Sequence, residues 1–164
     1  MKTNLLMNFS VDKENKKINV EREFAAPLPK VWAAWTESEI LDKWWAPRPW
    51  KTQTKYMDFS VGGYWLYAMA GPEGEKHWCR ADYRSITPLQ NFTGLDAFCN
   101  EEGVVTEQFP GSLWKNEFKV TANATVVHVE IQYKTLSDLE KIIEMGFKEG
   151  FTAALENLDE LFKS

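Results

Sequence analysis

The first part of the chain alternates apolar and polar residues, a pattern typical of half-buried antiparallel strands. The alternation runs through residues 5–11 and returns from Ile18 to Phe24, after a polar turn at residues 12–16. These two runs predict an opening β-hairpin. Between Lys51 and Tyr133 nearly every segment is a predicted strand or turn. Further strands are expected at 52–60, 64–70, 76–86, 92–98, 114–120 and 127–133.

Two short helices are predicted between the hairpin and the later strands. Pro29 suits the first position of a helix, because its fixed φ matches the helical value and its missing N–H is not needed there. Ser38 is the expected N-cap of the second helix, which Pro47 and Pro49 should end.

The end of the chain changes to a period of about 3.6, which is typical of an amphipathic helix. Ser137 and Glu140 match a capping box with Ser137 as the N-cap. The apolar stripe from Leu139 to Leu161 predicts one helix of about 25 residues, roughly 37 Å long. Such a helix can bury its stripe only against the apolar face of the sheet. The expected fold class is α+β: residues 1–164 form a single helix-grip domain, a curved antiparallel sheet around a long C-terminal helix.

Composition and charge exclude several classes of function. Acidic side chains outnumber basic ones by 24 to 19, and the net charge of −5 offers no attraction for nucleic acid. No apolar stretch of about twenty residues predicts a membrane span, and the apolar segment at the start is too short for a secretion signal. We therefore expect a cytoplasmic protein with neither nucleic acid nor membrane as a partner. In that reducing compartment Cys79 and Cys99 should remain free thiols in the core.

Aromatic residues make up 14 per cent of the chain, with eight Trp among them, more than an average core requires. They either fill a solid core or line a pocket, because rings offer a large contact area at low conformational cost. We predict a pocket between sheet and helix, with Tyr67, Tyr83 and Asn116 as polar anchors. The candidate ligand-binding residues are Trp50, Trp65, Tyr67, Met69, Tyr83, Phe98, Trp114, Asn116, Phe118, Phe147 and Phe151. A solid core is the alternative.

Two further groups of residues bear on this pocket. Trp44 and Trp45 are expected to be buried beneath the helix-loop segment, which leaves Trp50 as the candidate for the pocket rim. Gly146 and Gly150 lie four residues apart in the predicted helix, where each costs about 1 kcal/mol relative to Ala. Close approach of the helix to a bulky sheet residue is the favoured reason, and space for a ligand is the alternative.

No motif predicts catalysis, a cofactor or a metal site. His77 and His128 are the only histidines and are expected at the surface, without partners for a metal site or a nucleophile-base pair. Asp82, Asp96 and Glu130 are the acids nearest the centre of the sheet, where burial would raise a pKa toward the range useful for acid-base chemistry. Asp96 is interpreted more readily as a loop-capping residue than as a catalyst.

Several short motifs give the chain a family resemblance. They are Phe24-Ala25-Ala26-Pro27, Val31-Trp32-Ala33-Ala34-Trp35-Thr36, Lys43-Trp44-Trp45-Ala46-Pro47, Gly62-Gly63-Tyr64-Trp65, Gly146-Phe147 and Gly150-Phe151. With the order of the elements, they resemble the SRPBCC or START-like superfamily, and within it the bacterial relatives of the heat-shock-protein-ninety ATPase activator. Many relatives carry Arg two residues before the glycine pair, where this chain has Ser60. The resemblance implies the helix-grip fold but little about chemistry, because one fold hosts many functions.

Three functions follow as hypotheses. The first is a binding protein for a small hydrophobic or aromatic ligand, which requires a cavity. The second is an interaction module related to the chaperone activator, which requires an exposed patch that docks on a chaperone. The third is an enzyme of the cyclase or hydrolase kind, with Asp96 and Tyr83 as its only candidate residues. The protein is expected to act as a monomer or homodimer.

Overall fold

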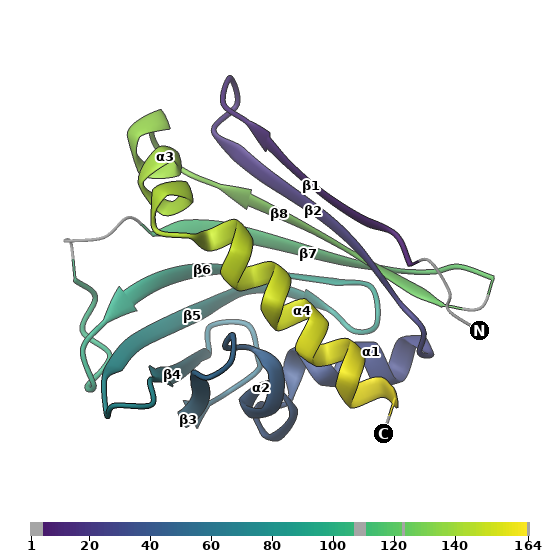
Figure 1. Ribbon diagram of the computed structural model, residues 1–164, viewed down its shortest axis with the longest axis horizontal. Helices are drawn as coiled ribbons and strands as arrows, with labels where there is room; N and C mark the ends of the chain where they lie inside the picture. Colours follow the sequence, from purple (N-terminus) through teal and green to yellow (C-terminus); the bar gives the residue numbers. More distant parts are fainter. Residues whose placement is uncertain (1–4, 107–110, 123, 164) are drawn as a thin grey trace.

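The computed structural model describes residues 5–106, 111–122 and 124–163. Eight strands form one antiparallel sheet with the spatial order β1-β2-β8-β7-β6-β5-β4-β3 (Figure 1). The strands are β1 (Met7–Asp12), β2 (Lys17–Phe24), β3 (Lys51–Met57), β4 (Tyr64–Ala70), β5 (Lys76–Thr87), β6 (Asn91–Cys99), β7 (Ser112–Val120) and β8 (Thr125–Gln132). The helices are α1 (Leu28–Thr36), α2 (Ser38–Trp44), α3 (Leu136–Glu144) and α4 (Phe147–Lys163). The predicted hairpin and the later strands are confirmed, with ends displaced by a few residues.

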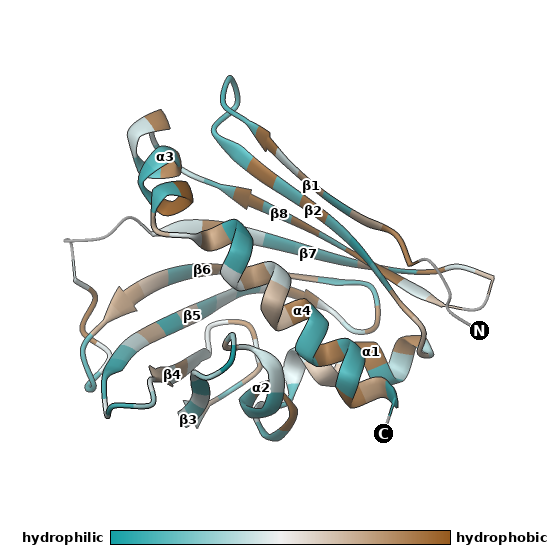
Figure 2. Ribbon diagram, viewed as in Figure 1, coloured by the Kyte–Doolittle hydropathy of each residue, from teal (hydrophilic) through white to brown (hydrophobic). Residues whose placement is uncertain are grey.

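The long helix α4 lies diagonally across the apolar face of the curved sheet, with α1 and α2 beside its C-terminal half (Figure 1). Its apolar and polar residues alternate around the helix (Figure 2), and Leu158 is fully buried. Asn157 Nδ2 donates a hydrogen bond of 3.0 Å to Ala46 O, which joins the helix to the segment after α2. The α+β helix-grip architecture predicted from the sequence is therefore confirmed.

The prediction of one continuous terminal helix is wrong. The chain turns at Gly146, whose φ of +89° lies in the left-handed region that glycine adopts without strain, and this turn separates α3 from α4. The predicted N-cap is also wrong. Thr135, not Ser137, has the extended backbone of a cap, and its hydroxyl oxygen accepts a hydrogen bond from the Asp138 N–H at 3.0 Å.

The starts of the two short helices also differ from the predictions. Helix α1 begins one residue earlier, with Pro27 as its N-cap and Pro29 as its second residue. Helix α2 begins at Ser38, so the N-cap is Glu37, whose side chain makes no capping hydrogen bond. Proline still fits the first turn of α1, because no residue there needs to donate an intrahelical hydrogen bond.

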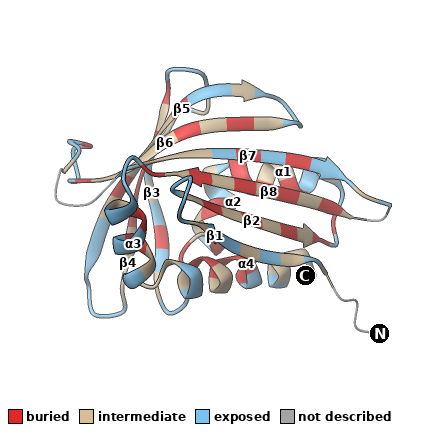
Figure 3. Ribbon diagram, turned by 90° about the horizontal axis from the view of Figure 1, so that it is seen from above, coloured by how far each residue is buried: buried red, intermediate tan, exposed pale blue. Residues whose placement is uncertain are grey.

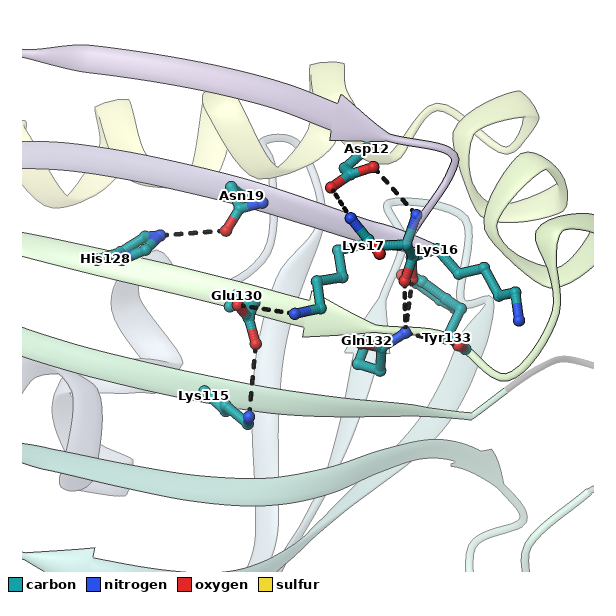
Figure 4. A network of polar contacts seen from close by, with 10 residues as sticks. Asp12, Lys16, Lys17, Asn19, Lys115, His128, Glu130, Gln132 and Tyr133 are labelled. Atoms are coloured by element: carbon teal, nitrogen blue, oxygen red, sulfur yellow. Dashed lines mark hydrogen bonds and ion pairs between the residues drawn. The ribbon is translucent and has the colours of Figure 1, made fainter.

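The sheet has one buried and one polar face over β2, β7 and β8. Buried residues recur at every second position of β2 and β8 (Figure 3). On the opposite face, Glu130 lies 3.4 Å from Lys17 Nζ and 3.6 Å from Lys115 Nζ, and His128 Nε2 lies 3.2 Å from Asn19 Oδ1 (Figure 4). His128 is therefore half-buried on the polar face, close to its predicted place.

Two positions depart from this division of the sheet. Leu66 of β4 points away from the inner face and is nevertheless buried, because the segment around Gly103 covers it. Val120, the last residue of β7, is 66% exposed although it alternates with the buried Phe118. No helix in the described ranges is long and apolar enough to cross a bilayer.

Candidate functional site

Two adjoining pockets lie between the inner face of the sheet and the helices. The outer pocket has a volume of about 250 Å³ and the inner pocket about 40 Å³. Residues of the outer pocket are Trp45, Pro47, Tyr67, Met69, Cys79, Asp96, Phe98, Ser112, Trp114, Tyr133, Ile142, Met145, Gly146, Phe147, Gly150 and Phe151. Residues of the inner pocket are Trp35, Leu41, Trp45, Trp65, Ala81, Tyr83, Phe92, Gly94, Asp96, Trp114 and Asn116. Trp45, Asp96 and Trp114 line both pockets and so mark their junction.

Nine of the eleven candidate residues predicted from the sequence line these pockets. The nine are Trp65, Tyr67, Met69, Tyr83, Phe98, Trp114, Asn116, Phe147 and Phe151. Trp50 lies outside both, with its ring 5.4 Å from that of the exposed His77. Phe118 also lies outside, because its ring packs in the core against Trp32 at 5.0 Å. Ligand binding by these residues stays a prediction.

Trp45 is a central wall residue that the sequence analysis assigned to simple burial. It follows the last residue of α2 and is half-buried. Its Nε1 donates a hydrogen bond of 3.1 Å to the Tyr67 hydroxyl oxygen, and its ring lies 5.7 Å from Trp65 and 5.8 Å from Trp114. The indole is thereby held between the two pockets. Its neighbour Trp44 is buried as predicted.

Asp96 is the only charged residue among those that line either pocket. It lies in the middle of β6, opposite Ala81 of β5 and Ser112 of β7, and it alternates inward with Gly94 and Phe98. Its interpretation as a loop-capping residue is therefore wrong. Within the part of the chain that the structure describes, its carboxylate has no hydrogen-bond partner.

Burial, with a smaller contribution from the Asp82 carboxylate of the neighbouring strand, raises the pKa of Asp96 from an ordinary value of 3.8 to about 7. The neighbouring phenols and the Cys79 thiol stay neutral at neutral pH. Burial, with a smaller contribution from Asp96, raises the pKa values of Tyr67, Tyr83 and the Cys79 thiol. Asp96 is thus the pocket group that changes charge near neutral pH.

Two buried polar atoms of the inner-pocket residues have no partner among the described residues. They are Trp35 Nε1 and Asn116 Oδ1. In contrast to the side-chain oxygen, the Asn116 side-chain nitrogen has a partner, because it donates a hydrogen bond to Phe92 O at 3.5 Å. Each of the two unpaired atoms therefore carries the free-energy cost of a buried polar group without a hydrogen bond.

Gly150 lines the outer pocket and leaves space beside it. A methyl group added there would have Pro47 Cγ, at 3.8 Å, as its nearest neighbour, which is an ordinary van der Waals contact. The expectation that both glycines permit close packing against a bulky sheet residue is therefore wrong. Gly146 serves the turn between α3 and α4, and Gly150 lines an open volume.

The raised pKa of Asp96 predicts a pH dependence of stability. Between about pH 4 and 7 the native state holds a proton that the unfolded chain has released, so the free energy of unfolding falls as pH rises through this window. We expect Asp96→Asn to lose this fall and to be more stable than the wild type at pH 8 but not at pH 4. Urea denaturation at pH 4 and pH 8 measures the free energy of unfolding of both proteins. The exposed Glu101→Gln control should keep the wild-type profile, and a wild-type profile for Asp96→Asn would contradict the prediction.

The chain matches the family model described as Activator of Hsp90 ATPase homolog 1-like protein over residues 25–163. A search of curated proteins finds no significant match. Many solved structures are similar to this chain, among them those of three bacterial proteins.

A protein from Mycobacterium smegmatis is 25% identical, with 96% of each chain covered and a TM-score of 0.88. One from Arthrobacter aurescens is 26% identical over 93% of this chain and 88% of that one, with a TM-score of 0.87. One from Nitrosomonas europaea is 27% identical over 91% of this chain and 95% of that one, with a TM-score of 0.79. The similarity therefore extends over the sheet and the helices that enclose the two pockets.

Proposed function

The chain belongs to the family of Activator of Hsp90 ATPase homolog 1-like proteins, and from this premise we propose that it binds a small hydrophobic or aromatic molecule between sheet and helix. The outer pocket carries the proposal. Its walls are formed largely by aromatic and aliphatic side chains from β4, β5, β6, β7, α3 and α4, with a few polar groups among them. Ligand pockets have this composition, because apolar walls supply affinity and a few polar groups fix the orientation of the ligand.

The volume of the outer pocket suits a ligand of modest size. A dry cavity of about 150 Å³ accommodates benzene. At about 250 Å³ the outer pocket has room for a larger body, such as an indole or naphthalene ring system. The surrounding rings favour an aromatic ligand, because edge-to-face and offset contacts add to the gain from burying its surface.

Binding of an apolar probe tests the proposal, and Gly150 provides the means to block it. We expect the neutral fluorophore N-phenyl-1-naphthylamine to bind with increased emission, and Gly150→Leu to weaken this binding at least about tenfold. The added side chain extends into the outer pocket, and replacing glycine within a helix favours the helical backbone by up to about 1 kcal/mol. Fluorescence titration gives the affinities, and thermal unfolding shows whether the variant is folded.

The matched control is Glu156→Leu, which adds the same side chain at an exposed position of α4. It should bind the probe like the wild type. Absence of saturable binding to the wild type, or equal binding by Gly150→Leu, would count against the proposal.

The free, buried thiols of Cys79 and Cys99 support a reducing, cytoplasmic location for the protein.

The family description supports a second proposal, in which the surface of the protein docks on a chaperone of the Hsp90 class. Exposed apolar side chains such as Val104 and Val105 are available for such a contact. Calorimetric titration with a purified bacterial Hsp90, together with its ATPase rate, tests this proposal. No heat of binding and an unchanged rate would remove it.

A further inference from the structure

We propose that the natural ligand carries a protonated amine, which pairs with the Asp96 carboxylate while its apolar body fills the outer pocket. The inference rests on the proposed function, because it assigns a chemical class to the ligand of the same pocket. Asp96 lies where the two pockets meet, and it lines both of them. A ligand whose body occupies the outer pocket can therefore bring one end to this carboxyl group.

The charges in the pocket walls determine which ligands can bind. No Lys, Arg or His occurs among the described residues that line the two pockets, and Asp96 is their only acid. A charge removed from water is costly unless an opposite charge meets it. A carboxylate or phosphate ligand would find no counter-charge here and would be repelled by Asp96. An ammonium group would find its counter-charge.

The uncharged groups around Asp96 also suit a cation. The rings of Trp45, Trp65 and Trp114 lie near the junction of the pockets, and the faces of indole rings attract cations. An ammonium group has three N–H donors and no acceptor. Asp96 provides acceptors for it, because both of its carboxylate oxygens are free of hydrogen bonds to described residues.

This pairing makes binding dependent on pH. The amine binds the ionised carboxylate, so affinity should fall by about tenfold per pH unit below about 7, where Asp96 becomes protonated. The other titratable groups that interact with Asp96 are Tyr67 of β4, Cys79, Asp82 and Tyr83 of β5, Cys99 of β6, and Tyr133 after β8. The thiols and phenols among them stay neutral, because their pKa values are raised. The described pocket residues of α3 and α4 carry no titratable side chain.

Three probes with the same indole body test the inference: tryptamine is a cation, tryptophol is neutral and indole-3-propionate is an anion. We expect calorimetry at pH 8 to give the tightest binding for tryptamine, at least about tenfold tighter than tryptophol, and the weakest for indole-3-propionate. Tryptamine should lose its advantage at pH 5 and in Asp96→Asn, whereas tryptophol should bind both proteins alike. The control Asp82→Asn, which alters a carboxyl group on the outer face of β5, should keep the preference for the amine.

The outcomes separate this inference from the proposed function. Binding of N-phenyl-1-naphthylamine and tryptophol without any preference for tryptamine would overturn the inference and leave the proposed function intact. A preference for tryptamine that persists in Asp96→Asn would also overturn it, because the amine would then be recognised elsewhere. Failure of every probe, including the naphthylamine, would overturn both.

Discussion

We expect Trp44→Ala to lower the free energy of unfolding by about 3 to 5 kcal/mol, the cost typical of removing a large buried aromatic side chain. Trp44 is 1% exposed, and its ring lies 5.0 Å from Trp35 and 5.3 Å from Trp45. Its Nε1 donates a hydrogen bond of 2.8 Å to Ala34 O, which joins α2 to α1. The substitution leaves a cavity and an unpaired carbonyl group, and chemical denaturation measures the combined cost.

The same change at Trp78 is the control. Trp78 is half-buried on the outer side of β5, where its ring lies near the Lys55 and Lys76 ammonium groups at 5.8 and 6.0 Å. Trp78→Ala should cost about 1 kcal/mol, since it removes weak cation-ring contacts and only part of a buried surface. If both variants lost equal stability, the assignment of Trp44 to the core would be wrong. Trp44→Ala should also weaken probe binding, because Trp45 would lose its support.

The alternation of residues in the sequence predicted the inner face of the sheet well, and the reason is physical. A strand between water and a core must alternate, so Val127, Val129 and Ile131 could be assigned to the core without any knowledge of their partners. The same periodicity concealed the break between α3 and α4. Both helices are amphipathic, so the apolar stripe continues across Gly146 although the backbone does not.

The assignment of Asp96 to a loop was wrong although the periodicity of the sequence pointed to the inner face. The inward alternation of Gly94, Asp96 and Phe98 was present in the sequence, but a charged residue inside an apolar set was interpreted as part of a loop. A carboxyl group in the wall of an apolar pocket is an exception to the rule that charges stay in water, and such exceptions concentrate at functional sites. Trp45 was missed because its position depends on how α2 packs on the sheet, which no local pattern specifies.

A charged residue on the inner face of β2 leads to the other large prediction, at the far end of α4. Arg22 of β2 is 7% exposed and its guanidinium donates a hydrogen bond to Asp159, to which it is also ion-paired. It donates to Glu23 O at 2.7 Å as well, and lies 5.0 Å from the centre of the Phe24 ring. Because Asp159→Ala leaves a buried guanidinium without its carboxylate, we expect it to lower the free energy of unfolding by about 3 kcal/mol in urea denaturation.

Two comparisons show whether the loss comes from an unpaired buried charge. Glu160→Ala breaks an exposed ion pair with Lys163 on the same helix and should cost no more than about 0.5 kcal/mol. The double variant Arg22→Met with Asp159→Leu should recover much of the stability lost by Asp159→Ala, because it removes both charges and retains apolar volume. If the double variant were less stable than Asp159→Ala, the ion pair itself would stabilise the contact between α4 and β2, and desolvation of Arg22 would be the smaller effect.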